Sequence, residues 1–187
     1  MSVGAMIAII MAIIIILIVI MMLSGSAGRR RRLKERFGPE YDKVVGERSS
    51  RRTAEAELAA RQRRVRKLRV HDLSDAARAK YEARWIEVQE RFVDDPSHAI
   101  SDAQALVEVV MGERGYPVSG YQQTVADLSV AHARALDHFR SAHEVGDRAA
   151  AGQATTEDLR IALLHYRELF GDLLGVVMTG EGHVGAA

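Results

Sequence analysis

The feature that most constrains this chain is an unbroken apolar stretch near its amino terminus, which stops abruptly at a run of arginines. Residues 3–23 contain no charged side chain, and nine of these 21 residues are isoleucine. Because a helix rises about 1.5 Å per residue, the stretch is long enough to cross a hydrocarbon core about 30 Å thick. We therefore expect residues 1–28 to be a transmembrane anchor and the chain to be a single-pass membrane protein.

Basic residues follow the apolar stretch and none precedes it. The cluster next to the predicted span consists of Arg29, Arg30, Arg31, Arg32, Lys34 and Arg36. Since Lys and Arg are enriched on the cytoplasmic side of a membrane, this asymmetry predicts a bacterial inner (plasma) membrane protein with an external amino terminus and a cytoplasmic domain. The same cations are expected to contact anionic lipid headgroups. The alternative is a cleaved signal peptide and a secreted helical domain, although a signal peptide has a basic start and a shorter apolar core.

Small residues recur at every fourth position of the apolar stretch, at Gly4, Ala8 and Ala12. Such a stripe lets two helices approach closely in lipid, where no hydrophobic force drives them together. It predicts a homodimer through this face of the helix, with a plain tether as the alternative.

Charge divides the rest of the chain into two parts, although the formal net charge of the whole is only +1. Residues 29–70 hold 16 Lys and Arg against 6 Asp and Glu, whereas residues 71–187 hold 10 against 19. We interpret the chain as the anchor, a basic juxtamembrane stalk at 29–71, a helical bundle domain at 72–178 and a flexible tail at 179–187. Whole-chain charge therefore gives no information about partners.

Apolar residues recur at helical spacing through both the stalk and the bundle. The stalk has a narrow seam of two heptads, too short for an independent coiled coil, so we favour a solvated helix that leans on the domain. This seam consists of Ala54, Leu58, Val65 and Leu68. In the bundle, stripes at spacings of three and four include Tyr81, Trp85, Val88 and Phe92, and later Leu159, Leu163, Tyr166, Phe170 and Leu173. Ser74 is a natural N-cap, Thr155 with Asp158 resembles a capping box, and no run alternates with period two, so the predicted fold class is all-α.

Five blocks of the sequence resemble a known family: RLKERFGPEYDKVV, RWIEVQERFVDDP, VMGERGYPV, ADLSVAHARALDHFRSAH and ATTEDLRIALLHYRELFGDLL. In this order they are similar to a family of small, uncharacterised, membrane-anchored proteins of actinobacteria, over residues 32–174. The resemblance implies an amino-terminal span followed by a helical domain. It implies no catalytic residue, and the family's His-Pro dipeptide is replaced here by His132 followed by Ala133.

No catalytic, cofactor-binding or metal-binding motif stands out in the sequence, and we expect none of these sites. There are no cysteines, and neither GxGxxG nor GxxxxGK[ST] occurs, so disulfides, thiolate sites and the common phosphate loops are excluded. His132, His138 and His143 are spaced by six and five residues, which does not place two rings on one helical face for a metal ion. The basic stalk lacks interleaved aromatic residues, so we expect no nucleic acid partner.

One loop offers exposed candidates for contact with another protein, namely Tyr116, Pro117 and Tyr121. Tyrosines among glycines are typical of a contact surface, and equally of a turn that covers the end of a bundle. The function that we expect is that of an adaptor or scaffold with an unknown protein partner, and not that of an enzyme. The alternatives are a small-ligand binder or enzyme whose site is assembled from residues distant in sequence, and a role in lipid or envelope organisation.

Overall fold

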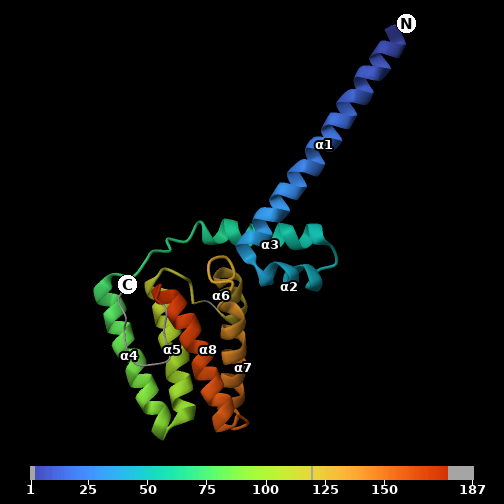
Figure 1. Cartoon of the computed structure of the whole chain (residues 1–187). Helices are drawn as coiled ribbons and strands as arrows, with labels where there is room; N and C mark the ends of the chain where they lie inside the picture. The colour runs from blue at the N-terminus through green and yellow to red at the C-terminus, as the bar shows by residue number, and fades with distance from the viewer. Residues whose placement is uncertain (1–2, 119, 177–187) are drawn as a thin grey trace. The chain divides into compact units, whose positions relative to one another are not determined.

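The computed structural model describes residues 3–118 and 120–176, apart from the side chains of residues 3, 5–9 and 18–27, so the predicted tail at 179–187 lies outside it. The described residues form helices joined by turns, in agreement with the predicted all-α class. These are α1 (Val3–Phe37), α2 (Pro39–Glu47), α3 (Arg51–Val65), α4 (Asp75–Asp94), α5 (Pro96–Glu113), α6 (Tyr121–Leu128), α7 (Leu136–Ala150) and α8 (Thr156–Leu174) (Figure 1). The chain divides into two compact units, Met1–Leu58 and Ala59–Ala187, with the boundary inside α3.

The amino-terminal helix corrects the prediction of a membrane anchor. α1 continues without a break through the arginine run to Phe37, so the apolar stretch is the first part of one longer helix. Within the described residues, no helix is long and apolar enough to cross a membrane. The predicted transmembrane helix is therefore wrong, and so are the single-pass topology and the inner-membrane location inferred from it.

The end of α1, α2 and the first half of α3 form a small core in the first unit. Gly38 has a positive φ of 49° and ends α1, and Pro39 begins α2 at the first helical position, where its missing N–H is not needed. Inside this core the Tyr41 hydroxyl donates to Glu55 Oε1 at 3.0 Å, and Arg29 lies 3.8 Å from Glu55 Oε2. A donor and a cation thus offset the cost of burying the Glu55 carboxylate. The buried apolar side chains are Leu33, Phe37, Tyr41, Val44, Ala54 and Leu58.

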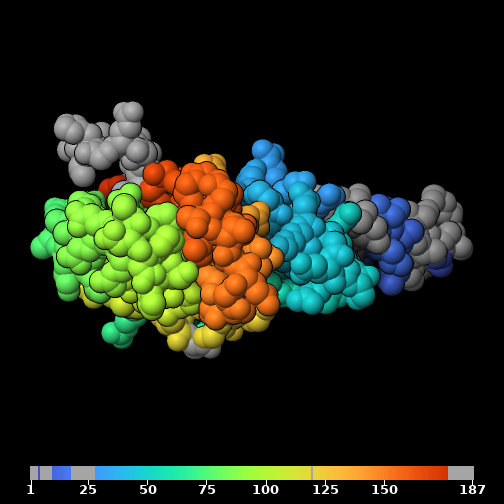
Figure 2. All heavy atoms as spheres, turned by 90° about the horizontal axis from the view of Figure 1, so that it is seen from below, coloured from blue at the N-terminus to red at the C-terminus, as the bar shows by residue number. Residues whose placement is uncertain are grey.

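The second unit contains a bundle of α4, α5, α7 and α8, which lie side by side in Figure 1 and are consistent with the predicted helical bundle. At its centre the Trp85 ring, which is 1% exposed, stacks on Phe170 of α8 with 4.8 Å between ring centroids. Figure 2 shows α4 and α5, coloured green, on the outer surface of this bundle. Further core residues include Tyr81, Ile100, Leu106, Val110, Met111, Leu136, Phe139, Leu159, Tyr166 and Leu169.

Local capping interactions determine where the bundle helices begin and end. Ser74 accepts a backbone hydrogen bond at the start of α4, and Thr155 with Asp158 forms the capping box of α8, as the sequence predicts. Asp95 serves two helices, because its backbone N–H donates to Arg91 O at the end of α4 while its side chain caps α5. A single residue therefore joins α4 to α5 and makes them an antiparallel pair.

The second half of α3 is held against α6 by polar contacts. Arg64 Nε donates to Asp127 Oδ1 at 2.9 Å, and the Asp127 side chain is fully buried. Arg61 donates to Ser129 Oγ at 3.3 Å. Val65 and Leu68 of the predicted apolar seam are only half-buried. Charged and polar groups, more than the seam, therefore position this end of α3.

Candidate interaction groove

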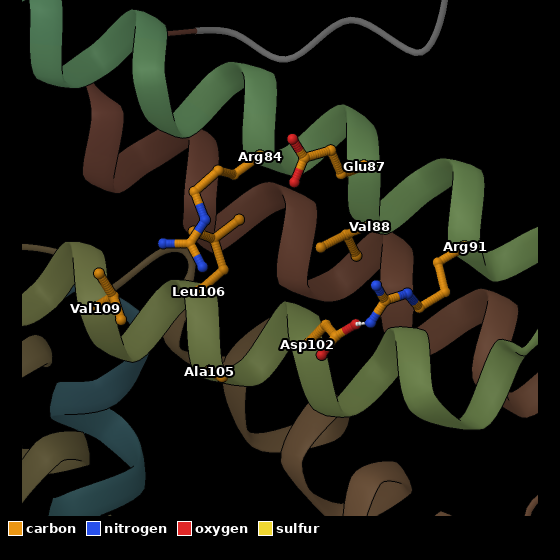
Figure 3. A pocket seen from close by; sticks show the side chains of 8 residues that line it. All are labelled: Arg84, Glu87, Val88, Arg91, Asp102, Ala105, Leu106 and Val109. Carbon is orange, nitrogen blue, oxygen red and sulfur yellow. Dashed lines mark hydrogen bonds and ion pairs between the residues drawn. The ribbon is translucent and has the colours of Figure 1, made fainter.

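A shallow groove with a volume of about 180 Å³ runs between α4 and α5 on the surface of the bundle (Figure 3). Four side chains of each helix line it, at spacings of three and four that place them on one helical face. They are Arg84, Glu87, Val88 and Arg91 of α4, and Asp102, Ala105, Leu106 and Val109 of α5. The antiparallel pair thus presents two ridges with a depression between them.

Apolar side chains lie at the floor of the groove, although polar atoms supply more of its exposed surface than apolar atoms do. Val88 and Leu106 are 6% and 2% exposed and connect the groove to the bundle core. Val109 keeps 44% of its surface exposed, and Ala105 is exposed as well. Covering apolar surface gains about 25 cal/mol per Å². The exposed parts of Val109 and Ala105 therefore favour contact with an apolar side chain of another molecule.

Charged side chains form the rims of the groove. Arg91 of α4 forms an ion pair with Asp102 of α5, which bridges the groove at the end near the α4–α5 turn. In Figure 3 the Arg84 side chain extends from α4 toward Leu106, while the Glu87 carboxylate stays beside α4. Arg84 and Glu87 form no ion pair or hydrogen bond with another described residue. The groove thus has a neutralised end and an end with an unpaired arginine.

The residues predicted as partner contacts lie against the bundle. Tyr116 is 3% exposed, its hydroxyl lies 3.2 Å from His132 Nε2, and burial raises the pKa of this hydroxyl. Tyr121 is half-buried and stacks on the His143 ring with 4.2 Å between centroids. Pro117 is half-buried. The loop therefore covers the bundle, and Tyr116 is not exposed to a partner.

Three polar side chains form a hydrogen-bonded chain that the sequence analysis missed. His132 Nδ1 lies 2.6 Å from Asp172 Oδ2, and its Nε2 faces the Tyr116 hydroxyl. Tyr116 follows α5, His132 precedes α7 and Asp172 lies in α8. The separations of 16 residues between Tyr116 and His132 and of 40 residues between His132 and Asp172 match no motif spacing. Only Asp172 reaches solvent, with 46% of its side chain exposed. These three hydrogen-bonded side chains are therefore suited to joining three segments of the protein. They are not suited to attack on a substrate, because the Tyr116 hydroxyl is buried.

The predicted membrane-proximal cations lie along the second part of α1. Three of the six form ion pairs: Arg29 with Glu55, Arg31 with Glu35, and Lys34 with Asp42. The others are exposed: Arg30, Arg32 and Arg36. A contact of this cluster with anionic lipid headgroups stays a prediction. So does a homodimer through Gly4, Ala8 and Ala12, since the Ala8 side chain lies outside the described residues.

Two histidines that are distant in the sequence come together between α7 and α8. The rings of His138 and His165 meet edge to face, with 5.0 Å between their centroids. Burial, and then the neighbouring His138, lowers the pKa of His165 below its ordinary value. Protonation of His165 is therefore expected to oppose the contact between these two helices. In the part of the chain that the structure describes, no group of three or more His, Asp or Glu side chains could hold a metal ion.

Comparison with known proteins gives no match. No family model matches the chain, and no curated protein or solved structure is significantly similar to it. The resemblance to a family of actinobacterial proteins therefore stays a prediction, and the function has to be inferred from the geometry of the groove.

Proposed function

We propose that this protein is a protein-interaction adaptor, whose bundle binds a helix of a partner protein in the groove between α4 and α5. The observation that supports this function is the combination of exposed apolar side chains of α5 with an unpaired arginine of α4 on the other side of the groove. Val109 supplies exposed apolar surface and Arg84 supplies a charge without a partner among the described residues.

The shape of the groove favours a helix as its occupant. The lining residues of α4 and α5 form two ridges at spacings of three and four, and the ridges of a third helix fit between such rows. Apolar side chains of that helix would contact Leu106 and Val109. The hollow is small, so we expect a transient complex with a Kd of about 1 μM, and not an obligate one.

The charge of the groove specifies one property of the partner. Arg91 is already neutralised by Asp102, whereas Arg84 is available for a charge-assisted hydrogen bond. Arginine is well suited to bidentate contact with a carboxylate, and such contacts are frequent at the centres of interfaces. The partner helix should therefore carry an Asp or Glu that meets Arg84, next to apolar residues that meet the floor.

The alternative functions, a small-ligand binder or an enzyme, call for a closed pocket on which titratable groups converge. The groove is open and shallow, and its Asp102 is engaged with Arg91. The Tyr116–His132–Asp172 chain has its hydroxyl buried at the inner end. Both features support the adaptor over these alternatives.

Site-specific cross-linking in cells tests the proposed function. A photo-reactive amino acid is placed at Val109 in the full-length protein and, as a matched control, at Ile161 of α8, which is 39% exposed and lies outside the groove. We expect one defined protein to be captured from Val109 and not from Ile161, and its capture to be lost when Arg84 is replaced by Glu. Capture that is equal at both positions, or that is unaffected by Arg84→Glu, would contradict the proposal.

A further inference from the structure

The outward face of α4, which points away from the groove, carries an exposed apolar stripe. Ile86 and Val93 are 53% and 82% exposed, and seven residues, or two helical turns, separate them. Ala79 and Ala83 are exposed on the same side of the helix. Exposed apolar residues that share one helix face can form a contact surface for another molecule.

Unpaired carboxylates flank this stripe. Glu82, Glu90 and Asp94 form no ion pair or hydrogen bond with another described residue. Glu90 and Asp94 are four residues apart, so two like charges are neighbours on the helix surface. Both also lie near the carboxyl end of α4, where the helix dipole favours cations. The occupant of this face should therefore be positively charged.

A complementary surface occurs on the same chain, in the last turn of α3 and the turn that follows it. Arg64 of this region is paired with Asp127. Its neighbours are exposed cations whose side chains have no ion pair or hydrogen bond with another described residue, namely Arg63, Arg66, Lys67 and Arg69. Each copy of the protein thus has a basic segment at 63–69 and an acidic, partly apolar helix face, and the two are not paired within one copy.

We propose that the outward face of α4 binds the basic segment 63–69 of a second copy of this protein. The cations of one copy neutralise the three carboxylates of the other, while the aliphatic parts of the arginine and lysine side chains cover the apolar stripe. The contact joins two different surfaces, so it is heterologous and produces open chains or rings of copies. It goes beyond the proposed adaptor function, because Glu82, Glu90 and Asp94 do not line the groove.

Sedimentation velocity of the full-length protein tests this self-association. At an ionic strength of about 0.05 M, where charges are weakly screened, the average mass should rise with protein concentration. At about 0.5 M it should return to the monomer value, because the contact is largely electrostatic. A protein that stays monomeric at both salt concentrations would overturn the proposal.

Charge reversal identifies the two surfaces. The acidic-face variant replaces Glu82, Glu90 and Asp94 with Lys, and the basic-segment variant replaces Arg63, Arg66 and Lys67 with Glu. Each variant alone should stay monomeric at low salt, since both of its surfaces then carry the same sign of charge. An equimolar mixture should associate, because the reversed surfaces of the two variants are complementary. A mixture that stays monomeric would overturn the assignment of the surfaces.

Two further variants test whether net charge alone determines association, and whether the apolar stripe contributes to it. A control replaces three exposed acids of α7 with Lys, namely Asp137, Glu144 and Asp147, and changes the net charge as the acidic-face variant does. It should still self-associate, and loss of association equal to that of the acidic-face variant would contradict the proposal. The second variant replaces Ile86 and Val93 with Ser, and should weaken association at least fivefold without changing any charge. Unchanged association of this variant would show that the apolar stripe is not covered.

Discussion

Replacement of Trp85 tests the packing that holds the bundle together. Trp85 is the largest fully buried side chain, and it stacks on Phe170 with 4.8 Å between ring centroids. Removal of a buried aromatic ring costs about 3–5 kcal/mol, because apolar contacts are lost and a cavity remains. Folded domains are stable by only about 5–15 kcal/mol, so Trp85→Ala should remove a large part of the free energy of unfolding. With an m-value of about 2 kcal/mol/M, the urea midpoint should fall by about 2 M.

A second substitution separates packing from hydrogen bonding at this position. The indole N–H of Trp85 is buried without a hydrogen-bond partner among the described residues, and such a donor costs roughly 1–3 kcal/mol. Trp85→Phe keeps an aromatic ring against Phe170 and removes the unpaired donor. The lost volume and the relieved donor have opposite effects, so we expect a net change smaller than about 1.5 kcal/mol.

Urea unfolding followed by far-ultraviolet circular dichroism measures both variants, since substitution removes the single tryptophan and its fluorescence. The expected order of stability is wild type close to Trp85→Phe, and both well above Trp85→Ala. A loss below about 1 kcal/mol for the alanine variant would show that the indole is not a core residue, and would refute the packing described for α4 and α8.

Three further predictions concern pH, backbone conformation and the hydrogen-bonded side chains Tyr116, His132 and Asp172. Because the pKa of His165 is lowered in the folded protein, the native state binds fewer protons than the unfolded state. The free energy of unfolding should therefore fall as the pH drops below about 6.5, by at most about 1.4 kcal/mol per pH unit. Urea titrations from pH 8 to pH 5 should show this slope reduced in His165→Gln relative to the wild type. Gly115 has a φ of 88°, and a Cβ there would lie 2.6 Å from the Arg69 carbonyl oxygen, so Gly115→Ala should cost about 1–3 kcal/mol. The control Gly112→Ala, in α5 with no atom within 4 Å of the added Cβ, should be stabilising by about 0.5–1 kcal/mol in the same thermal or urea assay. His132→Ala should cost about 1–3 kcal/mol because it leaves Tyr116 without its buried partner, whereas no loss would contradict a joining role for this chain.

Much of the helical structure was predictable because its causes are local. Pro39 and Pro96 begin helices, Ser74 caps α4, and Thr155 with Asp158 caps α8, and each signal lies within a few residues of the helix end that it determines. The apolar stripe around Trp85 likewise follows from spacings of three and four. These features depend on the sequence within one or two turns, so they can be recognised without a tertiary structure.

The groove and the polar chain could not be predicted, because they arise from residues brought together by packing. The ion pair between Arg91 and Asp102 exists because Asp95 folds α5 back along α4. The partners of His132 lie 16 and 40 residues away, and no spacing rule connects them. Tyr116 illustrates the limit most clearly, since a tyrosine in a glycine-rich loop is compatible with an exposed contact and with the buried position that it occupies.

The apolar amino terminus shows a different limit. The length of the uncharged stretch at residues 3–23 predicted a membrane-spanning helix. The prediction was wrong, because no described helix is long and apolar enough to cross a membrane, and the stretch belongs to a longer helix that ends at Phe37. An apolar stretch indicates that a helix is present. The end of that helix depends on where the chain next breaks, which here is at Gly38.

The most direct test of the adaptor function is the Kd of the full-length protein for the purified partner captured at Val109, measured by isothermal titration calorimetry. The groove predicts that Val109→Glu and Arg84→Glu each weaken binding at least tenfold, or about 1.4 kcal/mol, while Ile161→Glu changes it less than about twofold. Replacing the partner carboxylate with Lys should restore affinity to the Arg84→Glu variant. Equal affinities for the wild type and both groove variants would contradict the account.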